Sequence, residues 1–336
     1  MQTLLDGRGV DLRPHAKTHK SPFFAERQLV AGAVGITVAV LGEAAVMADA
    51  GIEDVFVAYP VWAVGAKARR VRELAGRIRL AVGVDSGEGA TQLGRAVDGA
   101  DDRPDVLIEI DSGERRTGTD AVRVVDVARA VVDAGLTLRG VFTHGGHAYR
   151  GPDRVVEAAM DEGSTLDAAV RRLRDAGFDV PVVSAGSTPT AVASSADPIT
   201  EERPGTYVFG DRQQANLGGS DPSSLALAVA ATVVSTAVAG RCVLDSGAKA
   251  LAKDRPGWLA GHGVVPQLPG AVIGSVYDHH AVLDLPPGLT PPRVGDVVAV
   301  VPNHACPVVN LTDELVLTRG GEHVEDLPVL ARGRTR

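Results

Sequence analysis

The chain of 336 residues predicts a TIM-type (β/α)8 barrel followed by a smaller antiparallel β domain. Over its first two thirds, short apolar runs alternate with amphipathic stretches, and this alternation is typical of βαβ units. The apolar runs are continuous, as expected of parallel strands that are buried on both faces. After about Gly218 the pattern changes to short β-rich runs separated by glycine and proline. An open, doubly wound sheet would give the same alternation and is the alternative for the first part.

The first part contains about seven or eight strand-then-helix units, the number that a closed barrel of parallel strands requires. The predicted strands are residues 10–12, 36–39, 55–58, 78–84, 105–110, 138–142 and 180–184. The predicted helices are residues 42–50, 66–74, 87–97, 121–134 and 155–176.

The second part begins after a turn-rich linker at 218–222. Its β-rich runs are residues 225–238, 241–244, 272–276, 297–301 and 315–318. Their spacing fits a small antiparallel sheet, so we predict a barrel domain over 1–218 and a β domain over 222–330.

The composition excludes several classes of protein. Lys and Arg number 34 against 42 Asp and Glu, and the net charge of −8 argues against a general nucleic-acid binder. No apolar run reaches the ~20 residues that span a bilayer, and the N-terminus has no signal-peptide pattern. The two cysteines, Cys242 and Cys306, are too few for a disulfide framework, so we expect a cytoplasmic protein.

The segment 13–20, Arg-Pro-His-Ala-Lys-Thr-His-Lys, places a lysine between two histidines directly after the first predicted strand. In a barrel this position lies at the carboxyl end of the strands, where active sites form. A lysine reacts with aldehydes once burial or neighbouring cations depress its pKa. Lys17 is therefore a candidate Schiff-base lysine, with a solvated basic patch as the alternative.

Other loops after predicted strands carry polar residues at the same end. Residues 143–149, Thr-His-Gly-Gly-His-Ala-Tyr, contain two glycines that let backbone approach a flat ligand, or they form an ordinary βα turn. The Ser, Gly and Thr residues of 184–190 predict an anion cradle, with a helix cap as the alternative. Residues 203–207 could add a phosphate contact and a ring hydroxyl, or form a Pro-Gly turn. Arg116 could fix a carboxylate or pair with Asp111.

The late segment 302–307, Pro-Asn-His-Ala-Cys-Pro, offers a histidine nitrogen and a cysteine sulfur, ligands suited to zinc. In a strand, His304 and Cys306 would share one face, and two protein ligands would leave positions open for water or substrate. A plain buried thiol is the alternative for Cys306. If His279 and His280 lie in a strand, only one of them can face a site.

Together these segments resemble the fold-type III pyridoxal-phosphate (PLP) enzymes related to D-serine dehydratase and D-threonine aldolase. The resemblance runs from about residue 8 to about residue 330. It rests on residues 13–20, 111–118, 143–149, 203–207, 245–249 and 302–307. It implies an alanine-racemase-like barrel followed by a β domain, and a homodimer in which the β domain completes the active site.

The resemblance also implies the roles of individual residues. Lys17, not Lys20, would bind PLP covalently, and His304 and Cys306 would hold the metal, for which zinc is expected and manganese and magnesium are the alternatives. Lys17, His304 and Cys306 would carry catalysis. The cofactor contacts beyond Lys17 would be His144, Tyr149, Gly186, Ser187, Thr188, Gly205, Thr206 and Tyr207.

Two features depart from the family pattern. Members usually begin with a further strand and helix ahead of the lysine segment, whereas here Met1 falls within the position of that first helix. In many relatives an acidic residue is followed directly by His-Gly. This chain has Asp278, His279 and His280 there, so a histidine stands at position 280 in place of the glycine. The role of this second segment stays open.

By the resemblance, the substrate is a D-3-hydroxy amino acid, and two outcomes are open. Removal of the α-proton by Lys17, with the metal on the 3-hydroxyl, gives a 2-oxo acid and ammonia, as in a dehydratase. Removal of the 3-hydroxyl proton cleaves the Cα–Cβ bond and gives glycine and an aldehyde, as in an aldolase. The soft Cys306 ligand favours the dehydratase, since aldolases more often carry aspartate there. An amino-acid racemase and a non-catalytic PLP-binding protein are further alternatives.

Overall fold

The computed structural model describes residues 1–335 and divides into two compact units. Unit 1 comprises residues 1–149 and 153–205 together with the C-terminal residues from Gly333. Unit 2 comprises residues 150–152 and 206–332. The domain limits predicted above, 1–218 and 222–330, stay a prediction.

Unit 1 is built on a parallel sheet with the strand order β1-β8-β7-β6-β5-β4-β3-β2. The end strands β1 and β2 are joined by a bridge between His15 and Thr37, where Ala16 N–H donates to the Thr37 carbonyl at 2.8 Å. The curled sheet therefore closes on itself, which confirms the predicted barrel over the open sheet.

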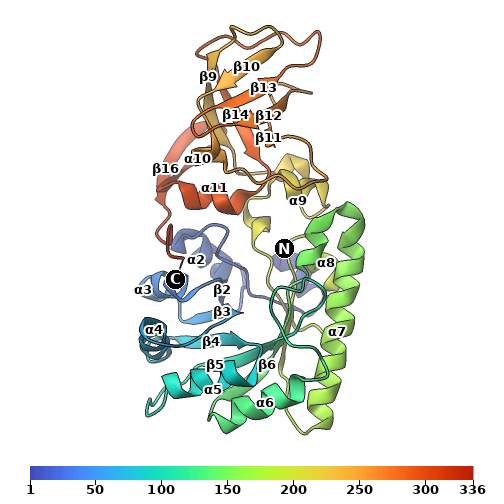
Figure 1. Ribbon diagram of the computed structural model, residues 1–336. Helices are drawn as coiled ribbons and strands as arrows, with labels where there is room; N and C mark the ends of the chain where they lie inside the picture. The colour runs from blue at the N-terminus through green and yellow to red at the C-terminus, as the bar shows by residue number, and fades with distance from the viewer. Residues whose placement is uncertain (336) are drawn as a thin grey trace. The chain divides into compact units, whose positions relative to one another are not determined.

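The strands and helices of unit 1 follow one another in alternation, with α3 to α7 on the outside of the strands (Figure 1). The strands are β1 Asp11–Leu12, β2 Ile36–Val38, β3 Asp54–Pro60, β4 Arg79–Val84, β5 Asp105–Glu109, β6 Thr137–Phe142, β7 Val182–Ala185 and β8 Glu201–Glu202. The helices are α1 Gln2–Asp6, α2 Pro22–Val30, α3 Leu41–Asp49, α4 Ala66–Ala75, α5 Gly87–Ala96, α6 Val124–Asp133, α7 Val155–Asp175 and α8 Ala191–Ser194.

Most predicted elements agree with these bounds to within one or two residues, and α6 shows the reason for a larger difference. We predicted a start at residue 121, but α6 begins at Val124. The Asp120 carboxylate accepts from the N–H groups of Val122 and Arg123, both at 2.9 Å, and so closes a separate turn before the helix. The apolar pattern alone did not distinguish this turn from helix.

Large apolar side chains fill part of the barrel interior. The rings of Phe56 and Phe142 pack edge to face, with centroids 5.1 Å apart, and Ala81 and Leu107 complete this buried cluster. Gly83 leaves the space that the ring of Phe142 occupies, because a Cβ there would lie 2.8 Å from the ring.

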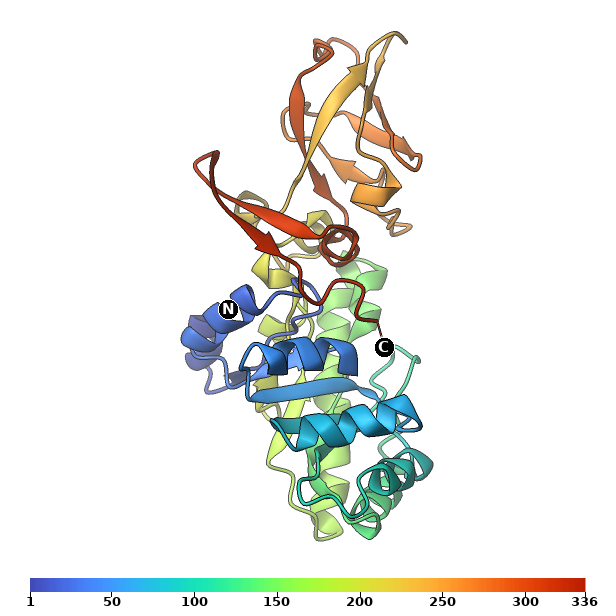
Figure 2. The ribbon, with the colours of Figure 1, turned by 90° about the vertical axis from the view of Figure 1, so that its left-hand side faces the viewer.

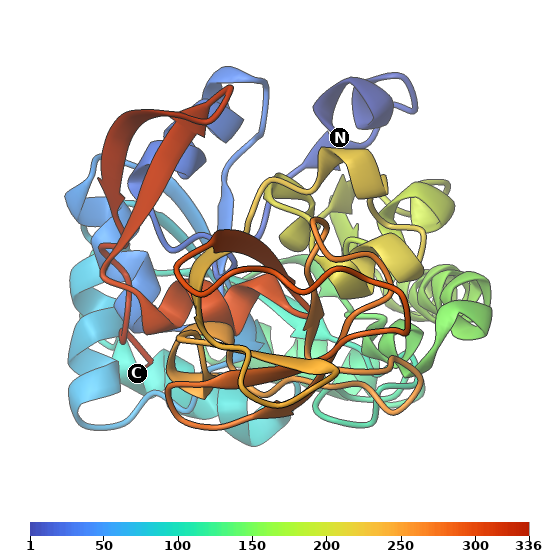
Figure 3. The same cartoon turned by 90° about the horizontal axis from the view of Figure 1, so that it is seen from above.

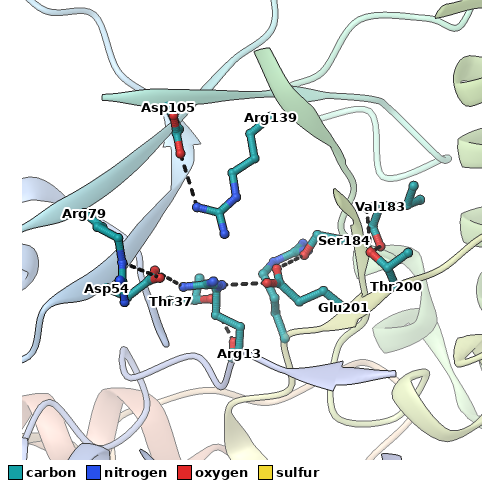
Figure 4. Close-up of polar contacts among 11 residues, drawn as sticks. Arg13, Thr37, Asp54, Arg79, Asp105, Arg139, Val183, Ser184, Thr200 and Glu201 are labelled. Carbon is teal, nitrogen blue, oxygen red and sulfur yellow. Dashed lines mark hydrogen bonds and ion pairs between the residues drawn. The ribbon is translucent and has the colours of Figure 1, made fainter. Parts of the chain in front are cut away.

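A network of polar contacts around Arg13, Glu201 and Ser184 lies next to these apolar side chains in unit 1 (Figure 4). The buried Arg13 guanidinium donates to Glu201 at 2.6 Å and also pairs with Asp54. The other oxygen of Glu201 accepts from the Ser184 hydroxyl, which in turn accepts from Arg203. Arg13 and Glu201 are therefore paired with opposite charge, and the Arg203 guanidinium is hydrogen-bonded, as buried charges require.

We expect Arg13→Leu to lower the free energy of unfolding by about 3–5 kcal/mol, because it leaves the buried Glu201 carboxylate without its cationic partner. The control is Arg123→Leu, since Arg123 forms an exposed pair with Asp120 and such pairs contribute about 0–1 kcal/mol. Urea denaturation of both variants measures the difference. Equal loss in the two variants would contradict a structural role for the buried network.

Unit 2 contains a six-stranded sheet, order β11-β14-β9-β10-β13-β12, whose pairs are antiparallel. This confirms the predicted antiparallel β domain. A separate hairpin of β15 and β16 follows and is seen apart from that sheet in Figures 2 and 3. The strands are β9 Val229–Ser235, β10 Arg241–Leu244, β11 Gly263–Val264, β12 Val272–Val276, β13 Ala281–Asp284, β14 Val297–Pro302, β15 Glu314–Arg319 and β16 Glu322–Pro328, and the helices are α9 Arg212–Asn216, α10 Ala248–Leu251 and α11 Ala305–Leu311.

The sheet of unit 2 has its own core of small and branched side chains, including Val233, Leu244, Ile273, Leu283 and Val300. Within residues 1–335, no helix is long and apolar enough to cross a membrane.

Candidate active site

The candidate lysine lies in a turn directly after β1, at the carboxyl end of the barrel strands. Lys17 is half-buried, whereas Lys20 is buried and its ammonium group pairs with Glu43 at 2.6 Å. The second oxygen of Glu43 accepts from the Ala39 N–H at 2.8 Å, so that ion pair is part of the framework. The ion pair of Lys20 with Glu43 argues against Lys20 as the reactive lysine.

Two histidines lie close enough to Lys17 to respond to its charge. Burial, followed by the charge of Lys17, holds the pKa of His15 well below its usual range. The same two causes, in the same order, lower the pKa of His144. Both rings are therefore neutral near pH 7 and can accept or donate a hydrogen bond without adding positive charge beside the lysine.

The loop after β6 carries His144 and ends in a short 3-10 helix, Gly146–Arg150. The rings of His144 and Tyr149 are tilted toward each other, with centroids 6.4 Å apart. His147 points elsewhere: its Nε2 lies 3.1 Å from Asp161 on α7, and its ring packs on Gly113. The structure thus gives the two histidines of this loop different surroundings, and the charge of Lys17 acts on His144.

The loop after β7 contains the predicted phosphate cradle, Gly186, Ser187 and Thr188, and all three residues are buried. Gly186 has a φ of 90°, which favours glycine, and its N–H donates to Glu162 at 3.0 Å. The Ser187 N–H donates to the Thr190 hydroxyl at 3.0 Å and so shapes the turn ahead of α8.

The loop after β8 packs closely on the lysine turn at Gly205. A Cβ on Gly205 would lie 2.9 Å from both the His15 carbonyl and the Thr18 hydroxyl, so only glycine fits there. Gly205 therefore packs directly against the segment that carries Lys17, and the Pro204 carbonyl accepts from the His15 N–H at 3.0 Å.

Arg203 does not extend toward the predicted phosphate contact. Its guanidinium lies in the barrel interior, where it donates to Ser184 and to the Thr143 carbonyl and lies 5.4 Å from the ring centroid of Phe142. The side chain therefore belongs to the buried network around Ser184, and any phosphate contact from this segment must come from the residues after it.

His304 and Cys306 lie in unit 2 at the start of a helix and not in a strand. β14 ends at Pro302, His304 caps α11, and Cys306 is the second residue of that helix. The expectation that a strand places both on one face is wrong for this segment. The two side chains still meet, because the tight turn into α11 brings the Cys306 thiol into hydrogen-bond contact with the His304 ring.

The His304 ring is oriented by an aspartate that the sequence did not single out. Its Nδ1 lies 2.7 Å from the Asp254 carboxylate, which leaves Nε2 for a ligand. Asn303 fixes the loop of Asp254, since its amide donates to the Asp254 and Gly261 carbonyls, both at 2.9 Å. A carboxylate behind a histidine is the usual support of a metal-binding ring.

Burial lowers the pKa of His304, but the hydrogen bond to Asp254 and the contacts with Cys306 raise it, and the result is about 10. Within residues 1–335, no group of three or more His, Cys, Asp and Glu side chains is arranged to hold a metal ion. A metal on His304 and Cys306 would therefore need water or substrate to complete its coordination. This donor set, one nitrogen and one sulfur, fits a borderline metal such as zinc.

Residues 278–280 form an exposed turn between β12 and β13, so the reasoning that treated them as strand residues is wrong. The turn is closed by the Tyr277 N–H, which donates to the His280 carbonyl at 2.8 Å. Lys249 lies beside it, 3.7 Å from Asp278 and 3.5 Å from His279. Lys249, Asp278 and His279 thus form one exposed cluster in unit 2.

The residues of unit 1 fit a PLP site by their chemistry. A lysine with two neutral histidines lies beside loops in which Gly186 and Gly205 leave no room for a side chain. These loops follow β1, β6, β7 and β8, and parallel strands bring their carboxyl ends to one end of the barrel.

Comparison with protein families agrees with this chemistry. Residues 1–213 match the alanine racemase N-terminal domain, and residues 226–318 match a putative serine dehydratase domain. The chain belongs to the fold-type III family of PLP enzymes. The resemblance drawn from its motifs is thereby confirmed.

Among curated members of the fold-type III family, the D-threonine aldolase of Arthrobacter sp is 33% identical over 100% of this chain and 89% of its own. The D-threo-3-hydroxyaspartate dehydratase of Delftia sp. strain HT23 is 35% identical over 91% of this chain and 86% of its own. The crystal structure of the D-threonine aldolase of Filomicrobium marinum superposes with a TM-score of 0.90 at 32% identity, covering 100% of this chain and 92% of that one. A D-threo-3-hydroxyaspartate dehydratase with a cysteine changed to alanine, solved in a metal-free form, also gives 0.90, at 32% identity over 98% of this chain and 92% of that one.

The sequence analysis missed three residues of this fold-type III chain that support the predicted site. Asp254 lies in a loop without a motif, and Glu162 and Glu202 lie within a regular helix and strand. The signal for Asp254 in the sequence was limited to its being an acidic residue of the β domain to which no role had been assigned. Buried Glu162 was detectable as an acid on the apolar face of a predicted helix, where charge is rare.

Proposed function

We propose that the chain is a PLP- and metal-dependent lyase that acts on a D-3-hydroxy amino acid, with dehydration to a 2-oxo acid and ammonia as the main reaction. The observation that carries the proposal is the pair His304 and Cys306 with Asp254 behind the histidine. A racemase does not need such a pair. The likeness over nearly the whole chain to an aldolase and a dehydratase of D-3-hydroxy acids supports the substrate class.

Lys17 would hold PLP, with His144 and Tyr149 beside it and the phosphate at Gly186, Ser187, Thr188, Gly205, Thr206 and Tyr207. The chemistry that PLP supplies when bound is withdrawal of electrons from the α-carbon of the amino acid. Lys17, once free of the cofactor, would take the α-proton on its Nζ. The neutral rings of His15 and His144 favour this step, because they add no cation that would compete for the proton.

His304 and Cys306 would hold the metal, which would bind the 3-hydroxyl of the substrate and help it leave as hydroxide. Asp254 would keep the His304 ring in the orientation that presents Nε2. Zinc is the metal that this donor set favours, with manganese and magnesium as alternatives. Aldol cleavage to glycine and an aldehyde is the second candidate, supported by the likeness to the D-threonine aldolases of Arthrobacter sp and Filomicrobium marinum.

Product identification tests the proposal. Purified protein with PLP, zinc or manganese, and either D-threonine or D-threo-3-hydroxyaspartate would be followed by NMR. A 2-oxo acid with ammonia supports dehydration, and glycine with an aldehyde supports the second candidate. Inversion of an amino acid without either pair of products would overturn the lyase proposal.

We expect Asp254→Asn to weaken metal binding by roughly 10- to 100-fold, the usual effect of removing a carboxylate behind a metal-binding histidine. The control is Asp326→Asn, because Asp326 forms an exposed pair of the same kind with His323 at 3.0 Å. Zinc affinity is measured by competition with a chelating dye. If both variants bind zinc like the parent protein, Asp254 has no role in the metal site.

We also propose a homodimer and a cytoplasmic location. The family resemblance supports the dimer. Both cysteines are free thiols, one of them buried in the β domain, which fits a reducing compartment. Sedimentation analysis of the purified protein tests the dimer.

A further inference from the structure

Two buried glutamates in unit 1 lie beneath the loops of the candidate cofactor site. Glu162 on α7 and Glu202 on β8 are both fully buried. One carboxylate oxygen of Glu162 accepts from Gly145 N–H at 2.8 Å and from Gly186 N–H at 3.0 Å. A single side chain therefore ties the loop of His144 to the loop of the phosphate cradle.

Glu202 approaches the same point from the other side. Its Oε1 accepts from the Ser194 hydroxyl at 2.7 Å, and its Oε2 lies 1.6 Å from the position that a Cβ of Gly186 would take. Both carboxyl groups thus meet at Gly186. This explains why residue 186 is glycine independently of its positive φ.

Each glutamate retains one buried oxygen, Oε2, without a hydrogen-bond partner among the described residues. Two ionised carboxylates cannot form a hydrogen bond with each other, because both groups only accept hydrogen bonds. A single proton on one of them supplies the missing donor and removes one of the two buried charges.

We propose that Glu162 and Glu202 share one proton and act as positioning residues that hold the Gly186–Thr188 loop in register with the loop of His144 for PLP. This inference rests on the proposed function, because it assigns the phosphate of PLP to that loop. A doubly ionised pair would place two negative charges beneath the phosphate, whereas a singly protonated pair places one.

The electrostatic surroundings agree with a shared proton. Burial, then the charge of Glu162, raises the pKa of Glu202 well above its ordinary 4.5, and burial raises that of Glu162. The charged groups that face the pair are Arg203, which stabilises the ionised form of both, and Glu201, which opposes ionisation of Glu202. Arg203 therefore stabilises one negative charge on this pair of glutamates, so one carboxyl group is ionised and the other keeps the proton.

The first test is PLP affinity of the full-length apoprotein, measured by absorbance and fluorescence titration without substrate. Glu162→Ala should bind PLP at least about tenfold more weakly, since two hydrogen bonds to a charged group are lost. Glu162→Gln should bind within about threefold of the parent, because its amide oxygen can accept from both the Gly145 and Gly186 N–H groups. The control is Glu157→Ala, on the exposed face of the same helix, where Glu157 pairs with Arg154.

The second test uses pH, which a purely structural role would not affect. The parent should lose PLP affinity relative to Glu202→Gln as pH rises above the raised pKa of Glu202, because the parent then gains a second charge and the variant cannot. The affinity ratio of the two proteins should be near one at low pH and grow with pH. A ratio that stays constant would overturn the shared proton.

The outcomes separate this inference from the proposed function. If the parent protein does not bind PLP, the proposed function fails. If the parent binds PLP but Glu162→Ala and Glu162→Gln bind it equally well, the positioning role fails while the function stands. If Glu162→Ala does not fold, the pH comparison of the parent with Glu202→Gln still decides.

The same proton predicts a change in stability with pH. Between the ordinary pKa of 4.5 and its raised folded value, Glu202 binds a proton in the folded state and releases it in the unfolded state. The free energy of unfolding of the parent should therefore fall as pH rises through this window, and more steeply than that of Glu202→Gln. Urea denaturation at several pH values from about 5 to 8 measures it, and parallel curves for the two proteins would contradict the shared proton.

Discussion

Replacement of Lys17 by alanine should abolish the absorbance band of lysine-bound PLP and lower turnover of a D-3-hydroxy amino acid by roughly 100- to 10,000-fold. The variant loses both the amine that holds the cofactor and the base that takes the α-proton, and a single acid–base group contributes about that much. Lys17 is half-buried in a turn, so its truncation leaves the barrel core in place. Spectral titration with PLP and product assays measure the two effects.

Lys20→Met is the matched control, since it removes a lysine three positions away. Lys20 pairs with the buried Glu43, so this variant should lose stability, by about 3–5 kcal/mol, and keep the absorbance band. An unchanged band in Lys17→Ala, or a band lost only in Lys20→Met, would rule out the assignment of Lys17.

Replacement of Cys306 by alanine should reduce bound zinc from near one per chain to background and lower activity by about 100-fold or more. One of two protein donors is lost, and a metal acting as Lewis acid contributes several kcal/mol to the transition state. Metal content is measured by atomic emission after dialysis, and activity by product formation with added zinc.

The control is Cys242→Ala, the other thiol of the chain. Cys242 is buried in β10 within the core of unit 2, so its loss should cost stability without changing metal content. Zinc content that stays at the parent level in Cys306→Ala would contradict the metal site. If Cys306→Ala loses the metal and keeps full activity, the protein is a PLP enzyme whose reaction does not use the metal.

Regular elements were predictable because burial imposes a period on the sequence. The continuous apolar runs at β3 to β6 and the amphipathic α7 were found to within one to three residues. Closure of the barrel depends on the bridge between His15 and Thr37. This contact is too short to leave a pattern in the sequence that would predict the pairing of the two end strands. Local turns such as that of Asp120 depend on one side-chain hydrogen bond and leave no periodic signal.

The sequence by itself determined the chemical groups: a lysine between histidines after the first strand, small residues after the later strands, and a His-x-Cys pair in the second part. These are reactive or flexible residue types, and their spacing is a property of the chain alone. Tertiary structure decided what surrounds them. Lys20 is committed to Glu43 and Arg203 to the barrel interior, while Asp254 supports His304. Such partners lie tens of residues away along the chain, and only folding brings them within hydrogen-bond distance.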